Sequence, residues 1–208
     1  MISPIYSKLA PIAFDMFYTP ALKGYGVIPE QRYSKSTFMT YRCRMNCKPV
    51  VAKMISSRHN DLCAQLENES HLLRCLQSTP NTPYLILHER DIPAGNITYF
   101  INLFRDGRFA GEKVDILVRE HIEGEELRPE EMIADPLEKD MLFGIINMAH
   151  GAGYSGIGIR NRRNYIRNSQ GKLHFIDLGA AAHASDRQRY KEFCQRDWIE
   201  FESICGKD

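Results

Sequence analysis

Residues 164–179 read Asn-Tyr-Ile-Arg-Asn-Ser-Gln-Gly-Lys-Leu-His-Phe-Ile-Asp-Leu-Gly. Two short apolar segments, residues 165–166 and 173–176, flank a polar turn in which glycine can supply a positive φ, and this pattern predicts a β-hairpin. Asn164 enters the hairpin and Asp177 leaves it. An amide oxygen and a carboxylate placed in this way can converge on one side, as Mg²⁺ carrying nucleotide phosphates requires. Taken alone, the stretch also fits a hairpin with ordinary polar ends.

Composition places the chain among ordinary soluble globular proteins. It has 208 residues, of which 43% are hydrophobic and 25% charged, and its formal net charge is +1. This length allows one large domain or two small lobes. The near-neutral charge provides no global attraction to nucleic acid or to an anionic membrane, and we expect no nucleic acid as a partner.

The cysteines and the apolar segments suggest a location. The six cysteines lack a paired Cys-x-x-Cys spacing, so reduced thiols in a cytosol-like compartment are the simplest interpretation. Residues 1–22 lack the apolar core of a Sec-type signal peptide. Residues 141–159 carry no Lys, Arg, Asp or Glu, but their polar residues and glycines argue against a membrane-spanning helix. We therefore expect a cytoplasmic protein without a membrane span.

The first half of the chain predicts strands followed by a helix. Residues 1–30 contain four prolines and indicate an irregular or partly extended lead-in. Residues 33–44 and 50–55 are rich in aromatic, Thr and β-branched residues and predict an antiparallel hairpin or meander. Lys53 interrupts the second of these apolar runs, either as an outward-facing edge residue or as a buried cation.

The predicted helix, residues 57–76, carries leucines along one face, and Glu69 falls within that face. A carboxylate on a buried face needs a cation, and Lys53 is the nearest candidate in the sequence.

The order of these residues resembles the layout of the protein-kinase family, in which a Val-x-x-Lys strand precedes a Glu-bearing helix and an Asn-hairpin-Asp-Leu-Gly segment. The resemblance implies that Lys53 holds the α- and β-phosphates of ATP and that Glu69 orients Lys53. It also implies that Asn164 and Asp177 bind Mg²⁺ and that Lys53, Asn164 and Asp177 are the catalytic set.

Two further segments fit the same resemblance. Residues 34–39 lie where kinases carry the Gly-rich phosphate loop, with Ser34, Ser36 and Met39 in place of the three glycines and an aromatic residue, Phe38, at the tip. The resemblance places Ser34 and Ser36 at the phosphates.

Residues 114–127 resemble the kinase hinge, in which an apolar strand leads into the linker between the lobes. Arg119 would gate the adenine pocket, and Glu120 to Ile122 would offer backbone donors and acceptors to adenine. Residues 83–88 and 97–104 predict strands joined by a turn-rich insert, residues 91–96.

The catalytic loop departs from the family. Counting back from Asn164, Ile159 occupies the position of the usual aspartate, and no Asp or Glu occurs between Asp140 and Asp177. The family's catalytic carboxylate is therefore missing. A cluster of Arg160, Arg162 and Arg163 adds positive charge that could stabilise transferring phosphate, bind an acidic substrate or simply be solvated.

The remainder predicts helices at residues 128–134, 137–149 and 186–205, and Asp197 in the last resembles the aspartate that supports the kinase catalytic loop. Only 29 residues follow Gly179 (208 minus 179), which implies a truncated helical C-lobe. The expected fold class is α+β, a minimal bilobal kinase-like fold. Its expected parts are a lead-in (1–30), an antiparallel-sheet N-lobe (31–119) and a truncated helical C-lobe (120–208).

The resemblance implies an atypical minimal kinase that transfers phosphate from Mg-ATP to Ser or Thr of a protein. Small bacterial effectors delivered into a host cell by a non-Sec route are examples of such kinases. The alternative is a pseudokinase that acts as a nucleotide-binding or scaffold module. Transfer of AMP by the same fold is a third reading.

Overall fold

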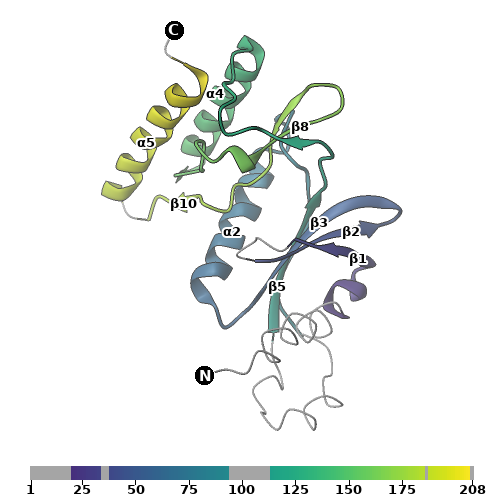
Figure 1. The fold of residues 1–208 in the computed structure, drawn as a ribbon. Helices are drawn as coiled ribbons and strands as arrows, with labels where there is room; N and C mark the ends of the chain where they lie inside the picture. Colours follow the sequence, from purple (N-terminus) through teal and green to yellow (C-terminus); the bar gives the residue numbers. More distant parts are fainter. Residues whose placement is uncertain (1–19, 34–37, 94–112, 186, 207–208) are drawn as a thin grey trace, which may run out of the picture. The chain divides into compact units, whose positions relative to one another are not determined.

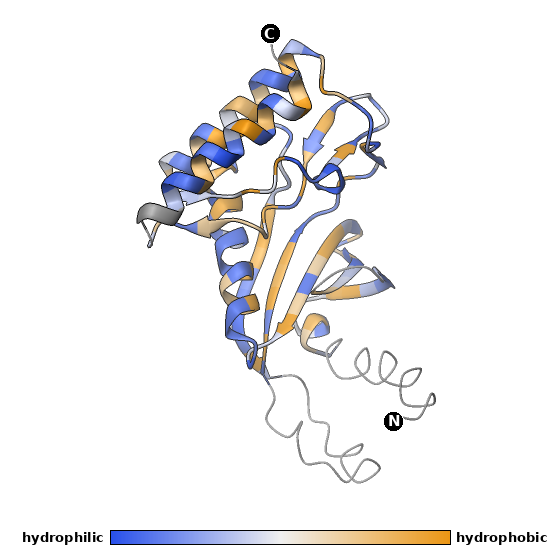
Figure 2. Cartoon of the chain, turned by 60° about the vertical axis from the view of Figure 1, so that its left-hand side comes forward, coloured by the Kyte–Doolittle hydropathy of each residue, from blue (hydrophilic) through white to orange (hydrophobic). Residues whose placement is uncertain are grey.

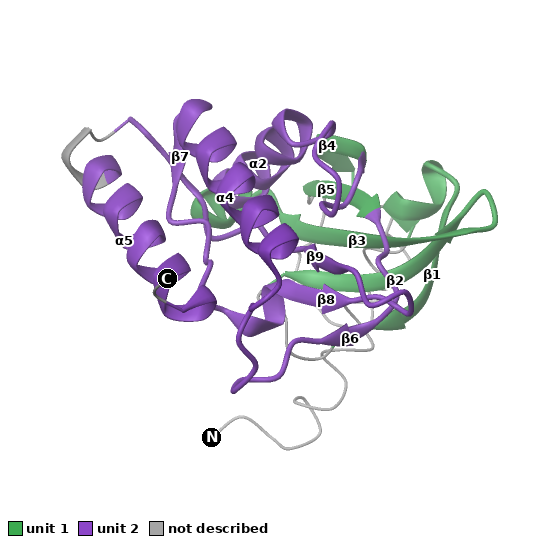
Figure 3. Cartoon of the chain, turned by 90° about the horizontal axis from the view of Figure 1, so that it is seen from above, with its two compact units in different colours: residues 1–63, 86–119 green, residues 64–85, 120–208 purple. Residues whose placement is uncertain are grey.

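The computed structural model describes residues 20–33, 38–93, 113–185 and 187–206. The structure is mixed α and β and divides into two compact units, coloured separately in Figure 3. Unit 1 comprises residues 1–63 and 86–119, and unit 2 comprises residues 64–85 and 120–208. Residues 64–85, which the sequence-based division assigns to the N-lobe, are thus grouped with unit 2.

Unit 1 contains a five-stranded sheet in the order β1-β2-β3-β5-β4, of which only Leu85, at the start of β4, belongs to unit 2. Figure 1 labels β1, β2, β3 and β5 of this sheet. Its strands are Val27–Arg32 (β1), Met39–Met45 (β2), Lys48–Ser56 (β3), Leu85–Pro93 (β4) and Lys113–Glu120 (β5). β2 pairs antiparallel with both β1 and β3, and Thr40 lies opposite Lys53. β1 begins at Val27, within the lead-in that we expected to be irregular or partly extended.

One face of this sheet forms the hydrophobic core of unit 1. Because side chains alternate along a strand, every second residue of β2, β3 and β5 points to this face. Figure 2 shows apolar residues in orange along the strands of this sheet. The buried residues of the cluster include Leu22, Tyr41, Cys43, Ala52, Met54, Ile116 and Val118.

A tight turn joins β2 to β3. Its two central residues, Asn46 and Cys47, have φ values of 50° and 62°. Two consecutive positive φ angles are typical of the type I′ turn, whose twist matches that of a hairpin, and asparagine tolerates this conformation better than most residues. The hairpin predicted for this part of the chain is confirmed.

Helix α2 spans Asn60–Cys75, close to the predicted residues 57–76. Leu66, Leu73 and Leu76 are all buried, and Glu69 is fully buried among them on the same face. The spacing of the leucines therefore correctly predicted that the Glu69 carboxylate lies on the apolar face of the helix.

Unit 2 contains helices α4 (Pro136–Gly151) and α5 (Arg187–Cys205). The side chain of Asp135 caps α4 by accepting a 2.8 Å hydrogen bond from the N–H of Leu137, and Pro136 fits the first turn because its missing N–H is not needed there. The two helices pack together, with the rings of Phe143 and Trp198 5.2 Å apart. Both helices agree with the predicted ranges.

Short strands complete unit 2. The order of one sheet is β6-β8-β9, and β7 pairs with β10. The elements are β6 (Glu125–Glu126), β7 (Tyr154–Ser155), the 3₁₀ helix η2 (Arg162–Asn164), β8 (Tyr165–Arg167), β9 (Leu173–Phe175) and β10 (Ala182–His183). β8 and β9 form the hairpin expected at residues 165–176, and Gly171 in its turn has a φ of 76°.

The helix predicted for residues 128–134 is wrong. A turn occupies residues 129–130, and residues 131–135 have no regular structure. The N–H of Ile133 donates to the carbonyl of Ile204 at 2.9 Å, so tertiary pairing with the end of α5 replaces helical bonding. Residues 91–93, expected to lie in the turn-rich insert, instead continue β4, and residues 94–96 lie outside the described residues. The strand predicted at residues 97–104 lies outside the described residues.

Two features concern the whole described chain. All six cysteines are free thiols. Among the described residues, no helix combines the length and the apolar character needed to cross a membrane.

Candidate functional site

The two ends of the β8–β9 hairpin meet at the backbone. The N–H of Ile176 donates a 2.7 Å hydrogen bond to the carbonyl of Asn164, and Tyr165 pairs with Phe175 next to it. Asp177 follows this junction directly. Asn164 and Asp177 therefore lie at the same end of the hairpin, as a shared site would require.

The Asn164 side chain is held from both sides. It is 4% exposed, its Nδ2 donates to the carbonyl of Gly158 at 3.0 Å, and its Oδ1 accepts from Nδ2 of Asn161 at 2.8 Å. An amide oxygen has two lone pairs, so one acceptor position remains on Oδ1. The amide is thus oriented in advance, with an oxygen that could still bind a cation.

Asp177 is half-buried, and its Oδ1 accepts a 3.0 Å hydrogen bond from the N–H of Gly179. This local turn orients the carboxylate. Among the described residues, no group of three His, Cys, Asp or Glu side chains could hold a metal. An Asn–Asp pair would therefore rely on phosphate oxygens for the remaining ligands, and its metal role stays a prediction.

The loop before Asn164 is hydrogen-bonded through its backbone to a buried carboxylate on α5. Asp197 is fully buried, and its two oxygens accept hydrogen bonds from the N–H groups of Gly156 at 2.7 Å and Ile157 at 3.2 Å. Nε2 of His150, at the end of α4, lies 3.0 Å from Asp197 Oδ2. This support of the loop by an aspartate on the last helix is the arrangement that the kinase resemblance implies for Asp197.

Ile159, at the position of the missing aspartate, is fully buried, as is Ile157. The carbonyl of Ile159 accepts a 2.7 Å hydrogen bond from the hydroxyl of Tyr165. Burial raises the pKa of Tyr165 well above its usual range, so this hydroxyl remains a neutral donor. The loop therefore uses these positions for packing and presents no carboxylate of its own.

Glu69 and the Asp177 segment belong to the same unit. Asn68, the residue before Glu69, donates from Nδ2 to the carbonyl of Ala181 at 3.1 Å. Ala181 lies four residues after Asp177 in the sequence. Within unit 2, a hydrogen bond thus joins α2 to the segment that follows Asp177, the candidate metal ligand.

Lys53 belongs to unit 1, where it is 4% exposed in β3. Its Nζ lies 5.7 Å from the centre of the Phe38 ring, close enough for a cation–π interaction. The side chain is thus buried, which excludes the outward-facing alternative. Ser34 and Ser36, the other predicted phosphate contacts, lie outside the described residues.

The backbone N–H of Glu120, one of the predicted hinge contacts to adenine, already has a partner within the protein. Glu120 ends β5, and its N–H already donates to the carbonyl of Tyr84 at 2.8 Å. Oε2 of Glu120 accepts from the N–H of Tyr84 at 3.3 Å, which closes a small ring of bonds. The Glu120 N–H is therefore unavailable to a base. Ile122, the other predicted backbone contact, is half-buried.

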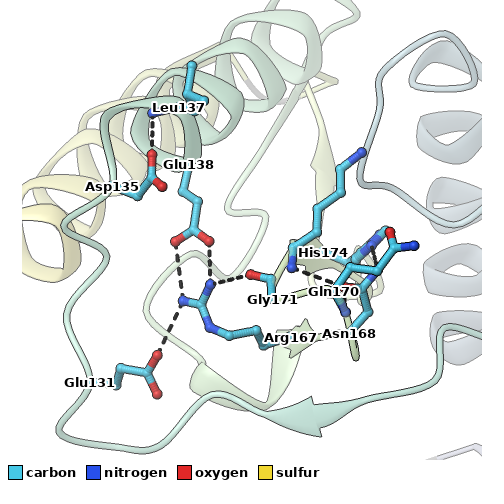
Figure 4. A network of polar contacts seen from close by, with 10 residues as sticks. Glu131, Asp135, Leu137, Glu138, Arg167, Asn168, Gln170, Gly171 and His174 are labelled. Carbon is cyan, nitrogen blue, oxygen red and sulfur yellow. Dashed lines mark hydrogen bonds and ion pairs between the residues drawn. The ribbon is translucent and has the colours of Figure 1, made fainter.

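An arginine that the sequence reading did not single out fixes the hairpin (Figure 4). Arg167 of β8 makes a two-pronged ion pair with Glu138 of α4, binds Glu131 at 3.2 Å, and donates to the carbonyl of Gly171 at 2.8 Å. These hydrogen bonds and charges raise the pKa of Arg167. The partners lie 29 and 36 residues away in the chain, so no local pattern could have identified the network.

No protein-family model matches the chain, and no curated protein shows significant similarity to it. The functional argument therefore rests on the residues and their contacts.

Proposed function

We propose that the chain is a kinase-like phosphotransferase that uses a Mg²⁺-bound nucleoside triphosphate to modify Ser or Thr of a protein. The observation that carries this proposal is the hairpin junction, in which the Asn164 carbonyl accepts from the N–H of Ile176 and so keeps Asn164 and Asp177 together. Both residues offer oxygen ligands, which suit Mg²⁺.

The kinase resemblance assigns the remaining roles in this proposal. It gives Lys53 the nucleotide phosphates, Glu69 the orientation of Lys53, and Asn164 and Asp177 the Mg²⁺. ATP is the nucleotide that the kinase resemblance implies. A cytoplasmic effector that modifies proteins of a host cell is the biological role that we infer from the same resemblance.

Loss of the loop carboxylate limits the rate but leaves the reaction possible. Phosphoryl transfer depends mostly on positioning and on neutralising charge, whereas a general base contributes on the order of 10²–10⁴ in rate. With Ile159 buried in place of a base, the acceptor hydroxyl would lose its proton to solvent or to the transferred phosphoryl group. We therefore expect slow turnover.

Transfer from γ-labelled ATP, with labelled GTP in a parallel reaction, tests the proposal in a host-cell lysate. Wild type should label itself or a lysate protein, and Lys53→Ala and Asp177→Ala should abolish the label. Lys48→Ala is the matched control, since Lys48 is an exposed lysine on the same strand. Absence of label with both nucleotides in the wild-type reactions would overturn the proposal.

A pseudokinase that binds a partner without catalysis is the second candidate, and the full burial of Ile159 favours it. In that case Lys53→Ala should retain biological activity, whereas a phosphotransferase would lose it. The intact mass of a modified target separates an added phosphate from an added AMP, which the third reading requires.

A further inference from the structure

One face of the unit 1 sheet carries Arg42 of β2, Lys53 of β3 and Arg119 of β5, together with the more exposed Arg44 of β2. The residues that alternate with them point into the hydrophobic core, so these side chains point to the opposite face. Arg42 pairs with Val51, and Thr40 pairs with Lys53, so β2 and β3 present their residues side by side. We call Arg42, Lys53 and Arg119 the cationic face.

The cationic face is buried to an unusual degree for its charge. Lys53 is 4% exposed and Arg119 is 5% exposed. Nε of Arg42 is buried, and the described part of the chain provides no hydrogen-bond partner for it. Burying a guanidinium donor without an acceptor is costly, which points to an acceptor that is supplied by a ligand.

Tyr33 lies beside both guanidinium groups. Its N–H donates to the carbonyl of Thr40 at 2.9 Å, which extends the line of β1. Burial raises the pKa of the Tyr33 hydroxyl, and the charges of Arg42 and Arg119 oppose that rise. Tyr33 as a whole residue remains 38% exposed, so a flat ligand could stack on its ring.

Guanidinium groups only donate hydrogen bonds, and they therefore select ligands that present acceptors. Among purines, a 6-oxopurine such as guanine presents O6 and N7, a pair of acceptors that arginine binds in a bidentate manner. Adenine presents N7 beside an amino group, which is a second donor facing the arginine. A site lined by arginines thus discriminates between the two bases.

We propose that the cationic face binds a 6-oxopurine nucleoside triphosphate in preference to ATP, with Lys53 on the phosphates and Arg119 and Arg42 on the O6 and N7 edge. This inference rests on the proposed function, since that function assigns Lys53 to the phosphates. Arg119 occupies the position at which the kinase resemblance places the gate of the base pocket.

Thermal-shift titration of the full chain in the presence of Mg²⁺ tests the preference, because a ligand that binds the folded state raises its apparent stability. The ligands are GTP, ITP, ATP and inorganic tripolyphosphate. ITP is the informative one, since its base differs from that of ATP only at the 6-position and the neighbouring ring nitrogen. We expect GTP and ITP to bind at least about 10-fold more tightly than ATP.

Arg119→Met should remove this preference and leave tripolyphosphate binding intact. Arg42→Met serves as a second variant if Arg119→Met does not fold, because Arg42 is less buried. Arg44→Met is the matched control, since Arg44 lies two residues further along β2 and pairs with Glu30 at 2.8 Å.

Each result decides between the inferences. ATP binding as tightly as ITP would overturn the base preference while the phosphotransferase proposal stands. Tripolyphosphate binding as tightly as ITP would show that the base is not recognised, and equal loss of preference in Arg44→Met would show that the effect is nonspecific; both results overturn the inference. Absence of binding by every triphosphate would overturn both proposals.

Discussion

Arg167 and Glu138 form a bidentate ion pair that joins the β8–β9 hairpin to the first turn of α4. The Glu138 side chain is only 12% exposed, so the Arg167 guanidinium supplies the charge and hydrogen bonds that water would otherwise provide. We predict that Arg167→Met lowers the free energy of unfolding by about 1–3 kcal/mol, because a largely buried carboxylate loses its partner.

Urea denaturation measures this loss. Glu131→Gln is the control, since Glu131 contacts the same arginine but is 37% exposed, and it should cost less than about 1 kcal/mol. Equal losses in the two variants would show that burial of Glu138 is not the source of the effect.

Gly158 and Gly171 provide a matched test of the loop that precedes Asn164. Both have positive φ, 77° and 76°, but a Cβ at Gly158 would lie 2.9 Å from Nδ2 of Asn164, whereas nothing lies within 4 Å at Gly171. Gly171→Ala should cost about 1–2 kcal/mol from its backbone conformation alone. Gly158→Ala should cost more and should displace the Asn164 amide.

Two measurements separate these effects. Urea denaturation gives the difference in stability, and a Mg²⁺-nucleotide thermal shift reports on the Asn164 oxygen. Gly158→Ala should lose the ligand-induced shift and Gly171→Ala should keep it. Retention of the full shift in Gly158→Ala would argue against Asn164 as a metal ligand.

Asp115 should make the stability of unit 1 sensitive to acid. Burial alone would raise its pKa, but hydrogen bonds from the Asp91 N–H, the Ser57 hydroxyl and the Cys63 thiol, with the charge of Arg90, lower it below the usual 3.8. A depressed folded-state pKa contributes stability above the unfolded-state value and loses it as the pH falls through the folded-state value.

We therefore expect the contribution of Asp115 to be complete above about pH 5 and to decline below about pH 4. Urea midpoints measured between pH 3 and pH 6 should fall less steeply toward acid in Asp115→Asn than in wild type. Parallel pH profiles for the two proteins would assign the acid sensitivity to other carboxyl groups.

The cysteines should differ in reactivity. Burial raises the pKa of the Cys43 thiol to about 12, and burial together with the charge of Asp115 raises that of Cys63 to about 11. Cys47 and Cys75 are exposed. Because the thiolate is the reactive form, iodoacetamide at pH 8 should modify Cys47 and Cys75 in the native protein and reach Cys43 and Cys63 only in urea. Peptide mass spectrometry reads the result.

Local patterns predicted much of the fold. The turn residues around Gly171 identified the β8–β9 hairpin, and the spacing of leucines placed Glu69 on the buried face of α2. Both predictions depend on interactions within a few residues, where periodicity and turn chemistry dominate. The bilobal kinase-like arrangement, in contrast, remains a proposal.

Long-range pairing explains what the sequence could not reveal. Residues 131–135 do not form the expected helix, and the N–H of Ile133 bonds instead to the carbonyl of Ile204. Arg167 pairs with carboxylates in the first turn of α4 and in the segment before it. The cationic face was equally hidden, since Arg42 and Arg119 lie on strands separated by an intervening one. Only the strand order shows that the two arginines share a surface.

The dependence of the Gly156 and Ile157 amides on Asp197 also sets an order of events during synthesis. The carboxylate lies 41 residues after Gly156, on the last described helix. A ribosome adds about 5–20 residues per second, so for several seconds the emerging chain holds its loop without that anchor. The nascent hairpin can therefore form early, while the loop beside Asn164 acquires its final shape only when α5 has left the exit tunnel.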